Sequence, residues 1–271
     1  MKLLYFGDVF GRPGRDAIQI AIPKLVAEHQ IDFVVINAEN AAHGNGILPD
    51  MAQKFIDWGV DVITTGNHAW DQKQIIPFMS TSTRVLRPAN YPDHPRFKAP
   101  GRGSTVVESR RRTGLRLGVV QVMGRVFMDA LDCPFRAGET EVERLEEIGI
   151  QSILVDFHGE ASSEKQAFTY YMDGKVSAVV GSHSHVQTAD ERVLPGGTAA
   201  ITDVGMCGCF DSVIGVKKEI SIQKFLTKRP HKFEPALGPG GYGAVVIDID
   251  EKTGKSRSIL RLREVNVTSL K

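Results

Sequence analysis

Short apolar runs followed by polar loops recur through the first third of the chain. Residues 3–6 (LLYF), 33–36 (FVVI) and 60–64 (VDVIT) each precede a loop and then a segment with helical character. Short continuous apolar runs are typical of buried strands, whereas apolar residues three and four positions apart indicate helices. Since a parallel connection needs a dozen or more residues, three such units in succession predict an α/β fold with parallel strands.

The remainder of the chain continues this alternation less regularly. The triple arginine at 110–112 has no aromatic residue interleaved with it, which indicates a solvated hairpin rather than a binding site. The turn residues TGK at 253–255 predict that the last two strands form a hairpin. The pattern predicts further strands at 104–108, 115–122, 152–157, 176–180, 199–203, 244–250 and 259–267, and helices at 138–148 and 216–227.

The charge balance narrows the classes of function. The 33 basic and 32 acidic residues give a net charge of +1, which offers no global field for stable binding of duplex nucleic acid or an acidic membrane. The apolar run before Gly7 and Asp8 is only four residues long, too short for a secretory or membrane-spanning segment. An odd count of three cysteines does not make a disulfide framework. We therefore expect a cytoplasmic protein, and the lack of a linker predicts a single domain over residues 1–271.

Polar residues that can act as ligands fall directly after the predicted strands. Asp8 follows the first strand, Glu39 and Asn40 follow the second, and Asn67 and His68 follow the third. The carboxyl ends of parallel strands meet at one edge of a sheet, and in open α/β sheets ligands bind at that edge. The sequence therefore predicts a binding site there.

Three histidines follow later strands in the same way. His158 comes directly after residues 152–157, and the stretch GSHSHVQTAD places His183 and His185 after residues 176–180. In an extended chain, side chains two positions apart point to the same side, so both imidazoles could reach one object beyond the strand end. Histidine is the commonest transition-metal ligand, which makes a metal the expected object.

Together these strand ends offer seven oxygen and nitrogen donors and no thiolate. Seven donors exceed the six of one octahedral ion, whereas two ions that share a bridging carboxylate use this number. Carboxylates mixed with imidazoles suit iron, manganese or zinc better than magnesium or calcium. We expect two transition-metal ions, with iron preferred and manganese or zinc as the alternatives. The predicted ligands are Asp8, Glu39, Asn40, Asn67, His158, His183 and His185.

The segments that carry these donors have a recognisable order. They read GDVFGRPGR, NAENAAHG, TGNHAWD, DFHGEA and GSHSHVQTAD, followed by TDVGMCG. In this order the chain resembles the calcineurin-like metallophosphoesterases, and more closely their YmdB-like branch, from Met1 to the C-terminal hairpin. The resemblance implies a four-layer α/β/β/α sandwich, with two mixed sheets packed together and helices outside.

The chain departs from the commoner pattern of that superfamily at two points. The usual motif D-x-H reads Asp8-Val9-Phe10 here, so one metal lacks an imidazole, and Glu39 stands where the bridging aspartate is usual. The YmdB-like resemblance implies that Asn40 substitutes as a donor. It then assigns the first metal to Asp8, Glu39, Asn40 and His185, and the second to Glu39, Asn67, His158 and His183.

The resemblance also implies an activity. It implies hydrolysis of phosphodiesters, with 2',3'-cyclic nucleotides as the expected small substrates, by a hydroxide that bridges the metals, with His68 as the general acid. Asp71 could orient His68 or cap a helix, and His43 could contact the substrate. The residues leave open a phosphomonoesterase on the same site, a regulatory RNA-associated protein with a weakly catalytic metal site, and assembly into a homo-oligomer.

Overall fold

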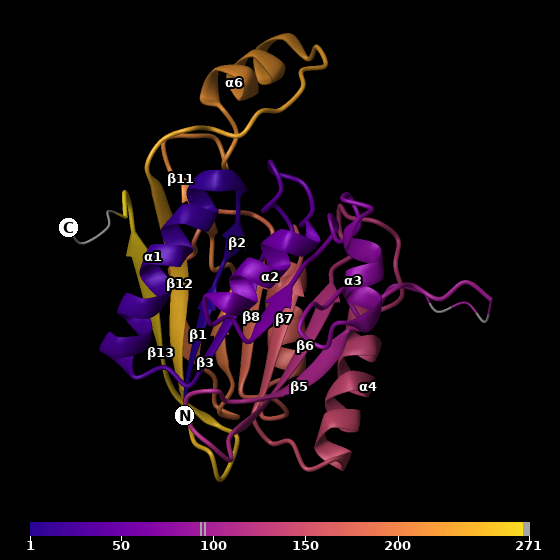
Figure 1. The fold of residues 1–271 in the computed structure, drawn as a ribbon. Coiled ribbons are helices and arrows are strands. Elements are labelled where there is room, and N and C mark those ends of the chain that lie inside the picture. Colours follow the sequence, from indigo (N-terminus) through magenta and orange to yellow (C-terminus); the bar gives the residue numbers. More distant parts are fainter. Residues whose placement is uncertain (93, 95, 268–271) are drawn as a thin grey trace.

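Two β-sheets pack face to face between layers of helices (Figure 1) in the computed structural model, which describes residues 1–92, 94 and 96–267. The helices are α1 (Gly11–His29), α2 (Pro49–Asp57), α3 (Ile75–Thr81), α4 (Pro134–Glu147), α5 (Ser162–Tyr171) and α6 (Lys218–Thr227). The strands are β1 (Lys2–Phe6), β2 (Asp8–Val9), β3 (Phe33–Asn37), β4 (Val62–Thr64), β5 (Ser104–Glu108), β6 (Arg116–Met123), β7 (Ile153–His158), β8 (Ala178–Ser182), β9 (Arg192–Val193), β10 (Ala199–Ile201), β11 (Met206–Cys209), β12 (Gly240–Ile249) and β13 (Ser256–Glu264). Within the described residues, we find no helix with both the length and the apolar character needed to span a membrane.

Both sheets are mixed. The first has the order β2-β11-β12-β1-β3-β4, with β13 also paired to β12, and the second has the order β5-β6-β7-β8-β10-β9. The strands β1, β3 and β4 are parallel, as are β6, β7, β8 and β10, whereas β12 runs antiparallel to β1. The three repeated units of the first third therefore do build parallel pairs, and the late strand β12 enters the sheet beside β1.

Three separate cores hold the layers together. Alternate residues of β1 divide between two of them: Leu3 and Tyr5 face the second sheet, and Leu4 and Phe6 face the helices. The outer face of the first sheet packs on α1 and α2, and the outer face of the second sheet packs on α4 and α5. Helices, sheet, sheet and helices thus follow one another, which confirms the predicted four-layer sandwich.

Residues 210–239, which we call the excursion, leave the first sheet after β11 and return to it at β12. Figure 1 shows that this segment, with α6, projects beyond the end of the sandwich. Two backbone hydrogen bonds close its base: Lys217 donates to the carbonyl of Glu234 at 3.0 Å, and Ala236 donates to the carbonyl of Gly215 at 2.8 Å. The helix predicted at 216–227 is confirmed, with its first residue at Lys218.

The triple arginine lies in the turn between β5 and β6 and forms ion pairs that the sequence did not predict. Arg110 and Arg111 contact the carboxylate of Asp61 at 3.2 and 2.7 Å, and Arg112 lies 3.3 Å from Asp32. The predicted hairpin is present, since β5 and β6 pair antiparallel on either side of the arginines, and Arg110 and Arg112 are exposed. The sequence did not predict the ion pairs, which compensate the fully buried carboxylate of Asp61. The terminal hairpin is confirmed, since β12 and β13 pair antiparallel around the predicted turn.

Candidate active site

The carboxyl ends of the parallel strands in both sheets lie at one edge of the sandwich, and all seven predicted donors lie there. Asp8 lies in β2, Glu39 and Asn40 follow β3, and Asn67 follows β4. The histidines come from the other sheet, where His158 ends β7 and the H-x-H pair follows β8. We call these seven residues the ligand cluster. Segments far apart in the sequence therefore supply one site, because the parallel strands of both sheets have their carboxyl ends on the same side of the sandwich.

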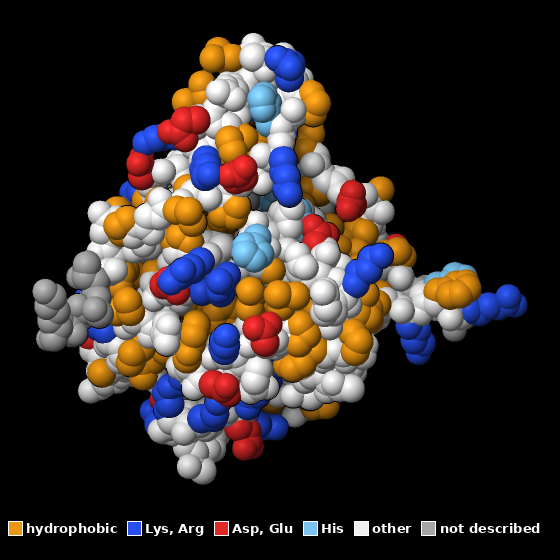
Figure 2. All heavy atoms as spheres, turned by 45° about the horizontal axis from the view of Figure 1, so that its top comes forward, with side chains coloured by type: hydrophobic (Ala, Val, Ile, Leu, Met, Phe, Trp, Pro, Cys, Tyr) orange, Lys and Arg blue, Asp and Glu red, His pale blue; other side chains and the backbone are white. Residues whose placement is uncertain are grey.

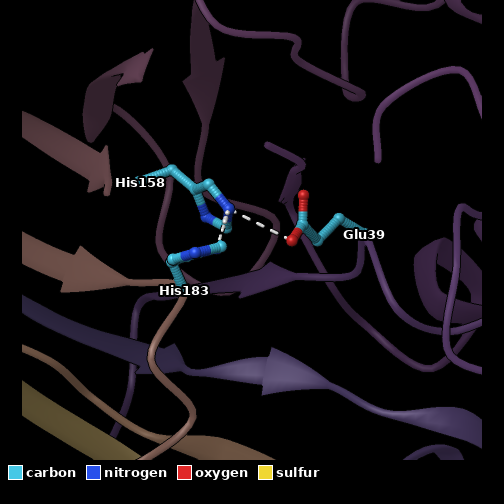
Figure 3. Close-up of side chains that lie close together, drawn as sticks. All are labelled: Glu39, His158 and His183. Carbon is cyan, nitrogen blue, oxygen red and sulfur yellow. Dashed lines mark hydrogen bonds and ion pairs between the residues drawn. The ribbon is translucent and has the colours of Figure 1, made fainter. Parts of the chain in front are cut away.

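One half of the ligand cluster is tightly packed. His158 Nε2 lies 3.1 Å from Glu39 Oε1, 3.0 Å from Asn67 Oδ1 and 3.1 Å from His183 Nδ1. Figure 3 shows the two imidazoles and the carboxylate converging on one point. Glu39, His158 and His183 form a group whose nitrogen and oxygen atoms all lie within 4.8 Å of one another, a spacing that could hold a metal ion.

The other half lies beside it. His185 Nε2 is 3.2 Å from Asn40 Oδ1, while the amide nitrogen of Asn40 donates to the carbonyl of Gly44 at 2.8 Å, so the amide oxygen faces the site. Asp8 accepts a hydrogen bond from the backbone of His183 through Oδ2, at 3.1 Å. Asn40 and His185 thus pair as the resemblance implies, whereas Asp8 contacts His183, which the resemblance assigns to the other metal. The division of the donors between two metals stays a prediction.

The charges of the ligand cluster favour a bound cation. Despite its burial, Glu39 has a pKa lowered to about 2 by the imidazoles of His158 and His68, and burial raises the pKa of Asp8 to about 6. Burial and the charge of His158 lower the pKa of His183 to about 3, which keeps that imidazole neutral. Burial opposes the charged form of His158, but Glu39 outweighs it and raises the pKa of His158 to about 9. Two buried carboxylates therefore face one charged imidazole, that of His158, and one neutral imidazole, that of His183. The negative charge of the cluster is thus only partly balanced.

An orphaned oxygen supports the same conclusion. Oδ1 of Asp8 is buried and has no hydrogen-bond partner among the described residues. A buried carboxylate oxygen without a partner is costly, by about 1–3 kcal/mol or more, unless a cation compensates it. The donor set, its negative charge and this oxygen fit metal ions at the cluster.

A buried polar chain fixes the ring of His158. Its Nδ1 lies 2.9 Å from Ser182 Oγ, and Ser182 donates to Asp156 Oδ1 at 2.7 Å. A serine hydroxyl has one hydrogen, so the oxygen that donates to Asp156 must accept from His158 Nδ1–H. Nε2 of His158 is therefore the nitrogen directed at the cluster, and it is the one that would give up its proton to a bound metal. Tyr5 and Thr64 donate to the other oxygen of Asp156 and so hold this series of hydrogen-bonded side chains between the two sheets.

The H-x-H pair reaches the site by a different geometry from the one expected. The strand β8 ends at Ser182, and His183 and His185 have φ angles of 101° and 63°. The assumption of an extended chain is wrong, because both residues occupy the left-handed region that non-glycine residues rarely adopt. Asp203 stabilises this turn, since its Oδ2 accepts from the backbone of Ser184 at 3.0 Å.

Sequence reasoning missed several residues of this site. A side chain at Gly66 would place its first carbon 2.4 Å from both Glu39 and His158, so only glycine fits in the GNH turn. The signal was present, because a glycine beside a ligand indicates a close approach of the backbone. Glu160, whose Oε2 lies 3.1 Å from His183 Nε2, was also missed. Its side chain is half exposed, and its position in a loop gave no pattern to find.

The predicted acid lies at the rim of the cluster. The backbone of His68 donates to Glu39 Oε2 at 3.0 Å, and its Nδ1 lies 2.7 Å from Asp71 Oδ2. Asp71 thus orients the imidazole and leaves Nε2 available. His68 and His43 both line a cavity of about 340 Å³ that opens over the ligand cluster.

The cavity has two unlike sides. Four residues of the ligand cluster line one side: Glu39, Asn40, His183 and His185. We call the whole ligand cluster the floor. The excursion contributes a wall that includes Ile214, Val216, Phe233 and Pro235. Phe10, which occupies the position of the usual histidine, also lines the cavity and packs edge-on against His185 with ring centroids 5.5 Å apart. Figure 2, turned to view this end of the molecule, shows hydrophobic and basic side chains together on the projecting excursion.

A two-sheet sandwich that gathers such donors at one edge is the architecture of the metallophosphoesterases, the class that the sequence resembles. The chain belongs to the YmdB-like protein family, whose model matches residues 4–262.

Relatives of known name cover almost the whole chain. A 2',3'-cyclic-nucleotide 2'-phosphodiesterase of Bacillus subtilis is 44% identical over 97% of this chain and 96% of its own length. A solved structure of a novel phosphatase from Mycoplasma pneumoniae superposes with a TM-score of 0.89 at 33% identity, covering 98% of this chain and 93% of that one. A hypothetical protein from Thermus thermophilus superposes equally well, with a TM-score of 0.89 at 39% identity and with coverage of 98% and 100%. The resemblance inferred from the motifs is confirmed.

Proposed function

We propose that this chain is a metal-dependent phosphodiesterase that hydrolyses 2',3'-cyclic nucleotides. The observation that carries the proposal is the ligand cluster, four of whose seven residues line a cavity of about 340 Å³ and three of which could hold a metal ion. Membership of the YmdB-like family and the name of the Bacillus subtilis relative support the choice of substrate. A cavity of this volume lies in the range of small-molecule sites.

The cluster residues would hold two metal ions in the division that the resemblance implies. Asp8, Asn40 and His185 would serve one ion, Asn67, His158 and His183 the other, and Glu39 would bridge them. When bound, two such cations lower the pKa of water and neutralise charge on the phosphate oxygens. Iron is our first choice because the set mixes carboxylates and imidazoles without a thiolate, and manganese or zinc satisfies the same donors.

The proton needed by the leaving group comes from the chain itself. Hydrolysis of the 2' ester forms a bond from a water oxygen to phosphorus and breaks the bond to O2', so the 2' oxygen must gain a proton. His68 is the proposed general acid, with Nε2 as the donor atom, since Asp71 holds Nδ1 at 2.7 Å. The product is then the 3'-monophosphate, with the fourth oxygen of its phosphate derived from water.

The test is a substrate panel with metal-loaded protein. Iron, manganese and zinc are loaded separately under anaerobic conditions, metal content is measured, and turnover is compared for 2',3'-cyclic nucleotides, linear diesters and monoesters. The proposal predicts about two metals per chain and highest kcat/KM for the cyclic diesters, with 3'-nucleotides as products. Preference for monoesters would make the chain a phosphomonoesterase instead.

A regulatory, RNA-associated role with a weakly catalytic site makes a different prediction. In that case, metal-loaded protein would turn over none of the three ester classes efficiently. Fewer than one metal per chain after anaerobic loading would contradict the two-metal assignment itself.

A further inference from the structure

The wall of the cavity offers an aromatic surface that phosphate chemistry does not need. Phe233 lines the cavity that also contains Glu39, His183 and His185, and 48% of its side chain is exposed. A large exposed ring is unfavourable in water unless a partner covers it. We propose that Phe233 stacks on the nucleobase of the substrate, and so makes the excursion the nucleoside-recognising part of the site. This inference rests on the proposed function.

The backbone that carries the ring is held in place by the base of the excursion. Its neighbour Glu234 accepts the backbone hydrogen bond of Lys217 at 3.0 Å, and the side chains of the same two residues pair at 2.6 Å. Together with the bond from Ala236 to Gly215, this backbone bond makes an isolated antiparallel bridge between Val216 and Pro235. A ring on a backbone fixed in this way costs less conformational freedom to order when a base stacks on it.

Charge around the ring also suits a nucleobase. The ammonium of Lys224, from α6, lies 4.0 Å from the centroid of Phe233. The cation covers one face of the ring and leaves the remaining surface to a flat partner. Stacking on an aromatic side chain is tolerant of sequence because every base has a π-face. We therefore expect all four bases to benefit, with purines ahead because their rings are larger.

The neighbouring aromatic residues do not share these features. Phe10 is only 7% exposed and presents its ring to His185, so it lies against the ligand cluster and offers little surface to a base. Phe225 lies on α6 with 69% of its side chain exposed and Lys228 at 5.6 Å, but it is not among the cavity-lining residues. Phe225 is thus a matched control, an exposed phenylalanine beside a lysine in the same segment.

The experiment compares a substrate that has a base with one that lacks it. Full-length, metal-loaded wild type, Phe233→Leu, Phe233→Trp and Phe225→Leu are assayed on 2',3'-cyclic AMP and on 1-O-methylribose 2,3-cyclic phosphate. We expect Phe233→Leu to lower kcat/KM about tenfold for cyclic AMP, mainly through KM, and less than twofold for the baseless substrate. Phe233→Trp should restore the preference for the base, and Phe225→Leu should change neither value.

Binding measurements separate this proposal from the proposed function. Calorimetry compares adenosine 3'-monophosphate with 1-O-methylribose 3-phosphate, and the base should improve the affinity of wild type about tenfold and that of Phe233→Leu hardly at all. A wild type that hydrolyses neither cyclic phosphate would overturn the proposed function, while this binding comparison would still decide the stacking. Equal losses on both ligands, or no loss in Phe233→Leu, would overturn the role of Phe233.

Discussion

The floor and the wall of the cavity are built in opposite ways. The floor residues Asp8, Glu39 and His158 are at most 1% exposed, and each is attached to a strand end of a sheet. The wall belongs to a projecting segment in which Phe225 and Phe233 leave most or half of their surface to solvent. The floor is fixed by two sheets at once, whereas the wall is tied to the sandwich mainly at its base.

This difference separates chemistry from selection. Metal ligands must hold their geometry closely, and strand ends that share three cores provide that rigidity. A wall that contacts only the part of the substrate remote from phosphorus can vary without disturbing the ligands. Changes in the floor should therefore act on metal content and kcat, and changes in the wall on KM.

The largest effect should follow from Glu39, the residue that we propose to bridge the two metals. Glu39→Gln removes the bridging charge from a site with a second buried carboxylate, so we expect loss of at least one metal per chain and on the order of a 10³-fold fall in turnover. Metal analysis after anaerobic loading checks the first effect, and steady-state kinetics checks the second. As a control, Glu219→Gln on α6 should retain full metal content. Unchanged metal binding in Glu39→Gln would contradict the bridging assignment.

The second prediction concerns His68, at the rim of the floor. His68→Ala should lower kcat for cyclic nucleotides by roughly 10²- to 10⁴-fold while metal content stays that of wild type. The loss should be much smaller for a p-nitrophenyl diester, because its leaving group needs no proton. If both esters lose equally, His68 acts in binding or structure rather than as the acid.

The third prediction tests the support beneath the floor. Ser182→Ala deprives His158 Nδ1–H of its acceptor and Asp156 of a donor, both fully buried. We expect the affinity for the second metal to fall about 10- to 100-fold, as is usual when a partner of a ligating histidine is lost. Competition with a chelator measures this, and Ser80→Ala on α3 is the control. Equal affinities would show that the ring of His158 is held by other contacts.

Much of the floor could be predicted because its signals are local. Each ligand follows an apolar run directly, and the rule that parallel strands end at one edge converts that position in the sequence into proximity in space. The positions of Asp8, Glu39 and Asn67 at that edge could be predicted from this rule alone. Asp156 carried a signal too, a carboxylate inside the run SILVDF, but only the first sheet, packed against the strand of Asp156, shows what it contacts.

The wall could not be predicted, for a physical reason. Residues 228–239 show no apolar period, and Phe233 acquires its place only when the excursion folds back over strand ends that lie far away in the sequence. The left-handed turn at His183 is similar, since its backbone follows from contacts with Asp8 and Asp203 rather than from the propensity of histidine. Tertiary contacts decide both features.

Glu160 lies between floor and wall and gives the smallest expected effect. It contacts a predicted ligand, His183 Nε2, at 3.1 Å, yet its side chain is 51% exposed. Because solvent screens such a contact, Glu160→Ala should lower the affinity for the second metal only about threefold. The affinity of Glu160→Gln should lie between those of Glu160→Ala and wild type. The affinity for the first metal should not change. Stepwise metal titration followed by calorimetry resolves the two ions. A loss as large as that of Ser182→Ala would show that contact with a ligand, and not burial, is what distinguishes the floor from the wall.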